Sequence, residues 1–262
     1  MNADRINELY AGQIFDLPTQ RAAKERIHWI CRQAQGEKIL DIGCSQGIVC
    51  LLLGREGFNC IGVDCEQDAI NFALKELEKE ESFVRQRVKF QLADASKLPF
   101  EDNFFDTVIL GEILEHLTHP EKVLQEARRL LKEGGKAIIT IPFGLNPADD
   151  HKRIYYPRSF LETVRPYFRM QLIDTLNDNI IYCGSKDASY DISKVSRETL
   201  LLEDLKMQEK VEERCLTKEQ TLFEKANILY AQIETLEEKI NSLTDTNRKS
   251  KLALEDKESK EA

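Results

Sequence analysis

The stretch KILDIGCSQGIVCLLL, residues 38–53, decides the fold class of this chain. A short β-run, Lys38–Ile42, leads into a turn of small residues, Gly43–Gly47, and an apolar helical run follows from Ile48. Glycine is common where a chain turns tightly between a strand and a helix, because it accepts a positive φ. The stretch therefore predicts the first strand–turn–helix unit of a parallel α/β sheet.

The same alternation of strands and helices continues along the chain. Periodicity predicts helices over 4–15, 19–33, 48–56, 67–80 and 120–132, and strands over 59–63, 88–92, 105–110 and 136–141. Gly134 and Gly135 are expected to end the last of these helices. Two further strands, near 168–175 and 179–183, flank Asn177-Asp178 and predict a hairpin. The expected fold is a doubly wound, Rossmann-like, seven-stranded and mostly parallel sheet that ends in a hairpin.

Composition narrows the class of protein. The 262 residues are 42% hydrophobic, which is enough for a sizeable core, and a net charge of −9 gives no general attraction for phosphate backbones. The charge therefore argues against nucleic acid as a partner. No apolar run is long enough to span a membrane, and the N-terminus is charged from Asp4.

The seven cysteines show no C-x-x-C spacing. Reduced thiols and a cytoplasmic location are expected.

The turn after the first strand fits three known patterns. As G-x-S-x-G it resembles the nucleophile elbow of a serine hydrolase, with Ser45 as the nucleophile. A hydrolase, however, would also need an oxyanion segment and a triad histidine, and no HGG-type segment precedes the loop. As a dinucleotide-binding G-x-G-x-x-G loop it would place Ser45 and Ile48 at the second and third glycines. Neither interpretation fits the loop well.

The third pattern is that of the class I S-adenosylmethionine-dependent methyltransferases, whose first strand and loop read [D/E]-x-G-x-G-x-G. The run from Asp41 to Gly47 resembles it, with Gly43 and Gly47 matching and Ser45 replacing the middle glycine. The resemblance implies S-adenosylmethionine as cofactor. It also implies that Asp41 accepts a hydrogen bond from the amino group of the methionine part, directly or through water.

Later segments match the same family in order. Asp64 ends the second strand 23 residues after Asp41, where the family's acid holds the ribose hydroxyls. Asp94 and Ala95 resemble the family's adenine-site turn, and Gly111 ends the fourth strand at the same site. The segment LLKEGGKAIITIPF, residues 130–143, resembles the family's helix, double-glycine turn and fifth strand. Asp41, Asp64 and Asp94 occur in the order that the family's acidic residues have along the chain. This makes the resemblance much stronger than the glycine loop alone would.

Chemistry beyond cofactor binding is expected where the fourth and fifth strands end. Methyl transfer to a hydroxyl needs a group that removes a proton, and His116, His151 and Glu115 are the candidates there. A helical turn in GEILEHL would place Glu112 on the same face, so a metal site of Glu112, Glu115, His116 and His151 is the alternative. That arrangement resembles the metal-dependent small-RNA 3′-terminal 2′-O-methyltransferases. The LEHL segment is nevertheless widespread among small-molecule methyltransferases, and the chain is acidic, so we favour no metal.

The segment IPFGLNPADDHKRIYYPRSF, residues 141–160, is expected to cover the mouth of the pocket. Similar loops occur in methyltransferases of glycan modification, so a hydroxyl of a small molecule or a glycan is the leading acceptor. Two alternatives stay open: the RNA 2′-O-methyltransferase, and a non-catalytic scaffold with a degenerate methyltransferase fold. Ser45 and the long C-terminal helix motivate the scaffold.

Composition changes after Gly184, the last of the 12 glycines and 7 prolines. A repeat with alternating spacings of four and three follows in this region, formed by Leu222, Ala226, Leu229, Ile233, Leu236, Ile240 and Leu243. Such a repeat predicts a long helix and a coiled coil, hence a homo-oligomer; a helix that packs on its own domain is the alternative. The expected organisation is 1–36 as N-terminal helices that cover the cofactor site, 37–185 as the methyltransferase domain, and 186–262 as the long helix.

Overall fold

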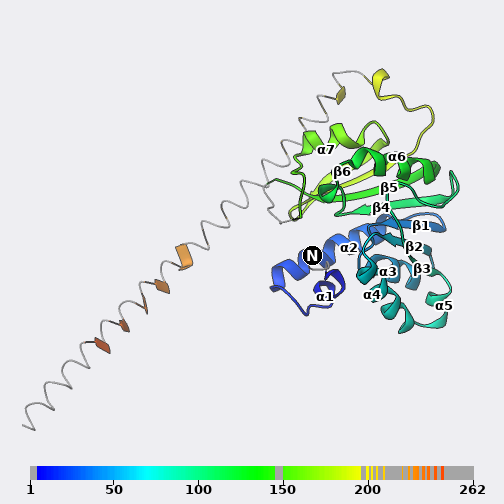
Figure 1. Cartoon of the computed structure of the whole chain (residues 1–262). Helices are drawn as coiled ribbons and strands as arrows, with labels where there is room; N and C mark the ends of the chain where they lie inside the picture. The colour runs from blue at the N-terminus through cyan, green and yellow to red at the C-terminus, as the bar shows by residue number, and fades with distance from the viewer. Residues whose placement is uncertain are drawn as a thin grey trace, which may run out of the picture. The chain divides into compact units, whose positions relative to one another are not determined.

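The computed structural model describes residues 5–144, 150–195 and 199–200, together with scattered helical positions between 202 and 244. The chain divides into two compact units, Met1–Gln208 and Glu209–Ala262. The first unit contains one seven-stranded sheet with helices on both faces (Figure 1).

The strands follow the order β3-β2-β1-β4-β5-β7-β6 across the sheet. Their bounds are β1 Lys38–Ile42, β2 Asn59–Asp64, β3 Val88–Leu92, β4 Phe105–Gly111, β5 Leu131–Pro142, β6 Arg169–Leu176 and β7 Asn179–Ser185. The neighbouring strands β3, β2, β1, β4 and β5 all pair in parallel. In contrast, β7 runs antiparallel to both β5 and β6. The prediction of a doubly wound, mostly parallel sheet that ends in a hairpin is confirmed.

The helices cover the sheet in two layers. Their bounds are α1 Ile6–Tyr10, α2 Leu17–Gln33, α3 Ile48–Arg55, α4 Gln67–Glu78, α5 Ser82–Arg85, η1 Leu114–His116, α6 Pro120–Leu130, α7 Pro157–Val164 and η2 Ile192–Lys194. Ile30 of α2 and Leu51 of α3 share one buried cluster with Ile109 of β4. On the other face Phe160 of α7 packs its ring 5.6 Å from that of Tyr182. Figure 1 shows α6 and α7 on the opposite side of the strands from α2 and α3.

Strand β1 lies at the centre of this arrangement. Ile39, Leu40 and Ile42 are fully buried, as expected for a parallel strand that has helices on both faces. Its neighbours are β2 on one side and β4 on the other, so the strand order reverses at β1. Ligands of doubly wound sheets bind beyond the carboxyl ends of the strands at this reversal. The turn at residues 43–47 begins at that position.

The predicted end of the fifth predicted helix is wrong. We expected a helix over 120–132 that Gly134 and Gly135 end, but α6 stops at Leu130 and β5 begins at Leu131. Leu131 is buried and pairs with Phe105 across the sheet. The two glycines lie within the span of β5, where Gly134 has a φ of +72° and a Cβ on Gly135 would lie 2.8 Å from the carbonyl oxygen of Lys132.

The first predicted helix is also shorter than expected. Instead of spanning 4–15, α1 covers Ile6–Tyr10. Gly12 and Phe15 have φ values of +77° and +63°, which a continuing α-helix does not allow. Asp16 then caps α2, because its side chain accepts a hydrogen bond from the backbone N–H of Thr19.

The residues that the structure describes in the second unit are helical. Five residues of the predicted repeat are described as helical there, with side chains exposed in the single chain: Leu229, Ile233, Leu236, Ile240 and Leu243. Leu222 and Ala226 lie outside the described residues. Among the residues that the structure describes, no helix combines the length and apolar character needed to cross a membrane.

Candidate functional site

The turn between β1 and α3 adopts backbone conformations that favour glycine. Gly43, Ser45 and Gly47 have φ values of +77°, +46° and +84°. A Cβ on Gly47 would lie 2.4 Å from Cζ of Phe90, so this position lacks space as well as a suitable φ. Ser45 keeps the left-handed conformation although it carries a side chain. The small serine therefore replaces the expected middle glycine without changing the type of turn.

Asp64, the last residue of β2, holds this turn in place. Its Oδ2 accepts a hydrogen bond from the backbone N–H of Ser45 at 2.8 Å, and its Oδ1 accepts one from the N–H of Glu66 at 2.9 Å. A carboxylate has about four acceptor positions, so it can still accept hydrogen bonds from two hydroxyls. The side chain is half-buried. This geometry fits the predicted ribose-binding role.

Asp41 lies beneath the turn and is almost completely buried, with 4% of its surface exposed. The thiol of Cys50 donates to its Oδ2 at 3.8 Å. Burial, and then the negative charge of Asp64, raise the pKa of Asp41 to about 7, which the hydrogen bond from Cys50 partly opposes. A buried carboxylate that lacks a cation is costly. A ligand ammonium group would supply the missing charge.

The remaining predicted cofactor residues follow neighbouring strands at the same edge. Asp94 comes just after β3, and its Oδ1 accepts two hydrogen bonds from the N–H and hydroxyl of Ser96, which lower the pKa of Asp94. The N–H of Ala93 donates to the carbonyl oxygen of Asp64 at 2.9 Å. Ala95 follows in the same turn, and Gly111 ends β4. The carboxyl ends of β1 to β4 thus bring the whole predicted set to one edge of the sheet.

Helix α1 also reaches this edge. The backbone N–H of Asn7 donates to Oε1 of Gln46 at 2.9 Å. Gln46 is a buried residue of the glycine turn, so α1 is attached to the loop that would hold the cofactor. We did not assign Gln46 from the sequence, because no local pattern marks its partner.

Three predicted catalytic residues come together just beyond β4. Glu115 and His116 lie on η1, and His151 comes from the loop before α7. Nε2 of His116 lies 3.8 Å from Oε1 of Glu115, and the centroids of the two imidazole rings are 4.9 Å apart. The N–H groups of Lys152 and Arg153 both donate to the carbonyl oxygen of Glu115. The loop that carries His151 is therefore fastened to η1 by backbone hydrogen bonds.

The helical turn that we expected to begin at Glu112 does not begin there. A helical turn through GEILEHL would have placed it beside Glu115 and His116, but Glu112 has a φ of +54° and η1 begins only at Leu114. Arg26 of α2 pairs with the Glu112 carboxylate at 3.4 Å. Within the described residues, the group with metal-binding geometry contains Glu115, His116 and His151 only. The sequence did not reveal Arg26 as a member of this site.

The charged surroundings of Glu115 differ from those of Glu112. Burial, and then the charge of Glu112, raise the pKa of Glu115 well above the usual range of a carboxyl group, although Arg26 opposes this effect. Glu115 is 1% exposed, whereas Glu112 already has the Arg26 guanidinium beside it. Glu115 is therefore the acid that lacks a compensating cation.

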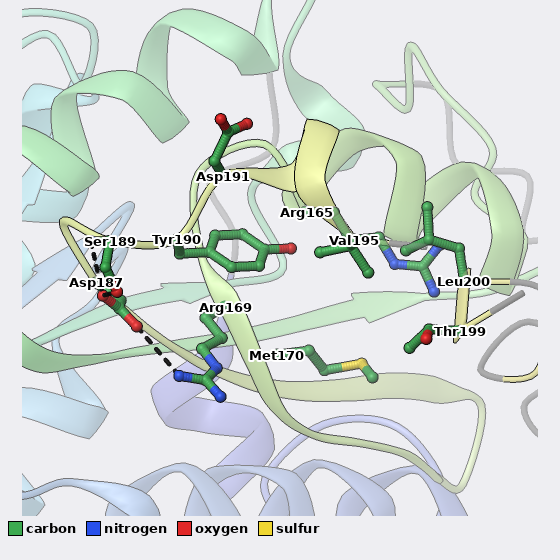
Figure 2. A pocket seen from close by; sticks show the side chains of 10 residues that line it. All are labelled: Arg165, Arg169, Met170, Asp187, Ser189, Tyr190, Asp191, Val195, Thr199 and Leu200. Carbon is green, nitrogen blue, oxygen red and sulfur yellow. Dashed lines mark hydrogen bonds and ion pairs between the residues drawn. The ribbon is translucent and has the colours of Figure 1, made fainter. Parts of the chain in front are cut away.

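A separate hollow of about 450 Å³ lies at the other edge of the sheet (Figure 2). Arg169 pairs in register with Ser185, which pairs with Lys136 in the first half of β5. The hollow is therefore at the amino ends of the parallel strands, opposite the glycine turn. Figure 2 shows Arg169 joined there to Asp187, with the ring of Tyr190 beside the pair. This hollow takes no part in the site described above.

Comparison with known proteins agrees with the geometry. Residues 40–139, from β1 into β5, match the methyltransferase domain family. The matched residues are thus similar to the class I S-adenosylmethionine-dependent methyltransferases. The match contains the glycine turn, Asp64, Asp94 and the Glu115-His116 pair. S-adenosylmethionine is the cofactor of this family, and the turn, Asp41 and Asp64 fit it chemically.

Two curated methyltransferases show how far the likeness extends. The chain is 34% identical over 121 residues to a ubiquinone biosynthesis O-methyltransferase of Pseudomonas aeruginosa, a match that covers 44% of this chain and 49% of the relative. It is 31% identical over 153 residues to a ubiquinone/menaquinone biosynthesis C-methyltransferase of Coxiella burnetii. This match covers 57% of this chain and 60% of the relative. The chain thus spans about half the length of these relatives.

Among solved structures, the [4+2]-cyclase SpnF shares the fold with a TM-score of 0.58. The two chains are 19% identical, and the likeness covers 64% of this chain and 83% of the cyclase. A methyltransferase-like fold thus also occurs in a protein named for another reaction. The fold places the cofactor site, while the reaction has to be argued from the side chains.

Proposed function

We propose that this chain transfers the methyl group of S-adenosylmethionine to a hydroxyl group of a small molecule or a glycan. The observation that carries the proposal is the double role of Asp64. Its carboxylate fixes the left-handed turn through Ser45 and keeps acceptor positions for a ribose at the reversal of strand order. The likeness to an O-methyltransferase supports oxygen as the acceptor atom.

The reaction defines what the side chains must do. S-adenosylmethionine supplies a methyl carbon bonded to a positively charged sulfur. When the acceptor oxygen attacks this carbon, the C–S bond breaks, an O–C bond forms and the hydroxyl proton must leave. His116 and His151 lie beyond the carboxyl end of β4 and offer imidazole nitrogens that can accept a proton. Glu115 lies beside His116 and would orient it.

Calorimetry with S-adenosylmethionine and a transfer assay test this function together. We expect one site per chain with a dissociation constant between about 1 μM and 1 mM, the usual range for enzyme substrates. Mass spectrometry would then record the gain of one CH₂ on sugars and on phenols offered as acceptors. Absence of cofactor binding would contradict the proposal. Binding without transfer to any hydroxyl acceptor would favour the non-catalytic scaffold.

The comparisons do not favour the two alternative functions. The relatives described above are named for quinone biosynthesis, and the net charge of −9 gives no broad attraction for RNA.

A cytoplasmic location forms part of our proposal. It is supported by the seven cysteines, which show no C-x-x-C spacing and fall mostly within apolar runs, as expected of buried reduced thiols.

We also propose that the C-terminal helix joins two or more copies of the chain. Leu229, Ile233, Leu236, Ile240 and Leu243 follow a repeat of four and three, and their side chains are exposed in the single chain. Each apolar side chain of this size gains about 1.5–3 kcal/mol when it is fully buried. Burial against the same face of another copy would gain this free energy in every heptad.

A shortened chain ending at Gln208 should therefore sediment as a monomer, whereas the full chain should sediment as an oligomer. The double substitution Ile233→Asp with Ile240→Asp should also give a monomer, because it places charges in the apolar seam. Glu224→Ala changes an exposed helical residue outside the repeat and should leave the mass unchanged. A monomeric full chain would contradict self-association through this helix.

A further inference from the structure

The apolar repeat of the C-terminal helix separates isoleucine from leucine. In a heptad repeat, position d comes three residues after position a, and the next a comes four residues after d. The sequence therefore places Ile233 and Ile240 at a. Position d is occupied by Leu229, Leu236 and Leu243. The structure describes all five residues as helical and exposed in the single chain. Together they form the seam of this helix.

The separation of the two residue types indicates how many helices the coiled coil contains. Isoleucine at a with leucine at d favours two parallel strands, whereas the opposite distribution, or isoleucine at both positions, favours three or four. A β-branched side chain is restricted to few χ1 rotamers in a helix, so it fits one layer of the seam better than the other. Ala226 occupies the first a position and is small enough for either arrangement. Ile233 and Ile240 therefore indicate a pair of helices.

Residues beside the seam indicate the direction of the two helices. In a parallel coiled coil, position g of one helix contacts position e in the next heptad of the other helix, five residues further on. From the sequence, these contacts are Lys225 with Tyr230, Gln232 with Glu237, and Lys239 with Thr244. None of the three joins two charges of the same sign. A parallel pair is therefore free of electrostatic repulsion at these positions.

An antiparallel pair would bring residues of like charge together. In that arrangement position g contacts g, and position e contacts e. If residues 226–243 of the two copies overlap, Lys225 lies beside Lys239 of the second copy at each end of the overlap. Glu237 then lies beside Glu237 of the second copy. Like charges at these flanking positions disfavour the orientation that brings them together. The charges thus favour parallel helices.

We propose that two copies of this chain bind each other through residues 222–243 as a parallel, in-register coiled coil of two helices. The seam of one copy is covered by the same seam of the other, with isoleucine facing isoleucine and leucine facing leucine. This arrangement rests on the proposed self-association of the C-terminal helix and adds the number, direction and register of the helices. Because the repeat follows Met1–Gln208 in the chain, both copies of the first unit join the helix pair at the same end.

Sedimentation equilibrium of the full chain tests the number of helices, and we expect the mass of two chains. A matched variant exchanges the residue types between the two layers of the seam: Ile233→Leu, Ile240→Leu, Leu229→Ile and Leu236→Ile. It keeps the composition of the chain, yet it should form oligomers of three or four chains, because leucine at a with isoleucine at d favours them. Glu224→Ala, at an exposed helical position outside the seam, should leave the dimer unchanged.

Cross-linking through a native cysteine tests the direction and register. Cys215 comes seven residues before Leu222, so it continues the series of d positions in the sequence. A parallel, in-register pair places it opposite Cys215 of the second copy, whereas the antiparallel overlap places it opposite residue 254. Diamide takes up two hydrogen atoms as two thiols form a disulfide, and it should convert the wild type into a covalent dimer. Cys215→Ser should stay uncross-linked, while Cys65→Ser, at an exposed cysteine of the first unit, should cross-link as the wild type does.

Several outcomes would overturn the proposal. A wild-type mass of three or four chains would exclude the pair of helices, and an exchange variant that stays a dimer would show that the two residue types do not set their number. A dimer that diamide does not cross-link, or that cross-links equally in Cys215→Ser, would exclude the parallel arrangement. A single-chain mass at every concentration would contradict self-association itself. Because none of these measurements involves S-adenosylmethionine, failure of the proposed methyl transfer would be recognised separately.

Discussion

Asp64→Ala should weaken the binding of S-adenosylmethionine by about 100- to 10,000-fold. The carboxylate accepts hydrogen bonds from Ser45 and Glu66 within the protein and has acceptor positions left for the ribose. Hydrogen bonds to a charged acceptor are worth about 1.5–3 kcal/mol each, and two ribose hydroxyls would lose theirs. Each 1.4 kcal/mol corresponds to a tenfold change in affinity. Calorimetry of the purified variant measures the loss directly.

Two further substitutions separate this effect from damage to the fold. Asp64→Asn keeps one acceptor oxygen and should lose less affinity, about tenfold. Asp68→Ala removes an exposed acid from the first turn of α4 and should keep the wild-type affinity. If Asp64→Ala bound S-adenosylmethionine as well as the wild type, with an unchanged melting temperature, the ribose assignment would be wrong.

Local sequence patterns predicted the elements whose residues interact mainly with their neighbours in the chain. The bounds expected for β3, Val88–Leu92, agree with the structure, because a short apolar alternation between turns marks it completely. The end of α6 could not be found in this way. Leu131 leaves the helix to pair with Phe105, and that partner lies on another strand. A glycine pair is a strong local signal, but sheet pairing overrides it here.

The same distinction between local and long-range interactions applies to the residues of the candidate site. Asp41, Gly43, Gly47 and Asp64 belong to one strand–turn–helix–strand unit, so the resemblance to a short family pattern was enough to identify them. The contact between Arg26 and Glu112 joins α2 to the end of β4. No periodicity in the sequence predicts this contact. The positive φ of Glu112 also falls on a residue type that rarely adopts it. Such positions occur often at functional sites, where local rules fail.

Asp41→Asn should make the ligand-free protein more stable at pH 8 and at the same time reduce its affinity for the cofactor. Burial raises the pKa of Asp41 to about 7 in the folded chain, against 3.8 for the free side chain. The folded state thus binds this proton more tightly than the unfolded state. The associated stability is complete below about pH 4 and is lost as the pH rises to about 7. At 1.36 kcal/mol per pKa unit, the loss is at most about 4 kcal/mol.

Asparagine has the same shape as aspartate and no charge, so this pH dependence should disappear. Urea unfolding at pH 5 and pH 8 measures it: we expect the wild type to lose about 2–3 kcal/mol more than Asp41→Asn between the two values. Asp68→Asn, at an exposed position, should behave as the wild type does. Equal pH dependence in the wild type and Asp41→Asn would show that the buried carboxyl group does not carry this cost.

Cofactor binding should change in the opposite direction. An ionised Asp41 can form a charge-assisted hydrogen bond with the ammonium group of S-adenosylmethionine, and asparagine cannot, so the variant should bind about 10- to 100-fold more weakly. Wild-type affinity should rise between about pH 5.5 and pH 7 as the carboxyl group ionises, while that of Asp41→Asn stays flat. Together, a gain in stability and a loss of affinity would identify Asp41 as a group whose buried charge is retained for its ligand. Loss of both would instead indicate a purely structural carboxylate.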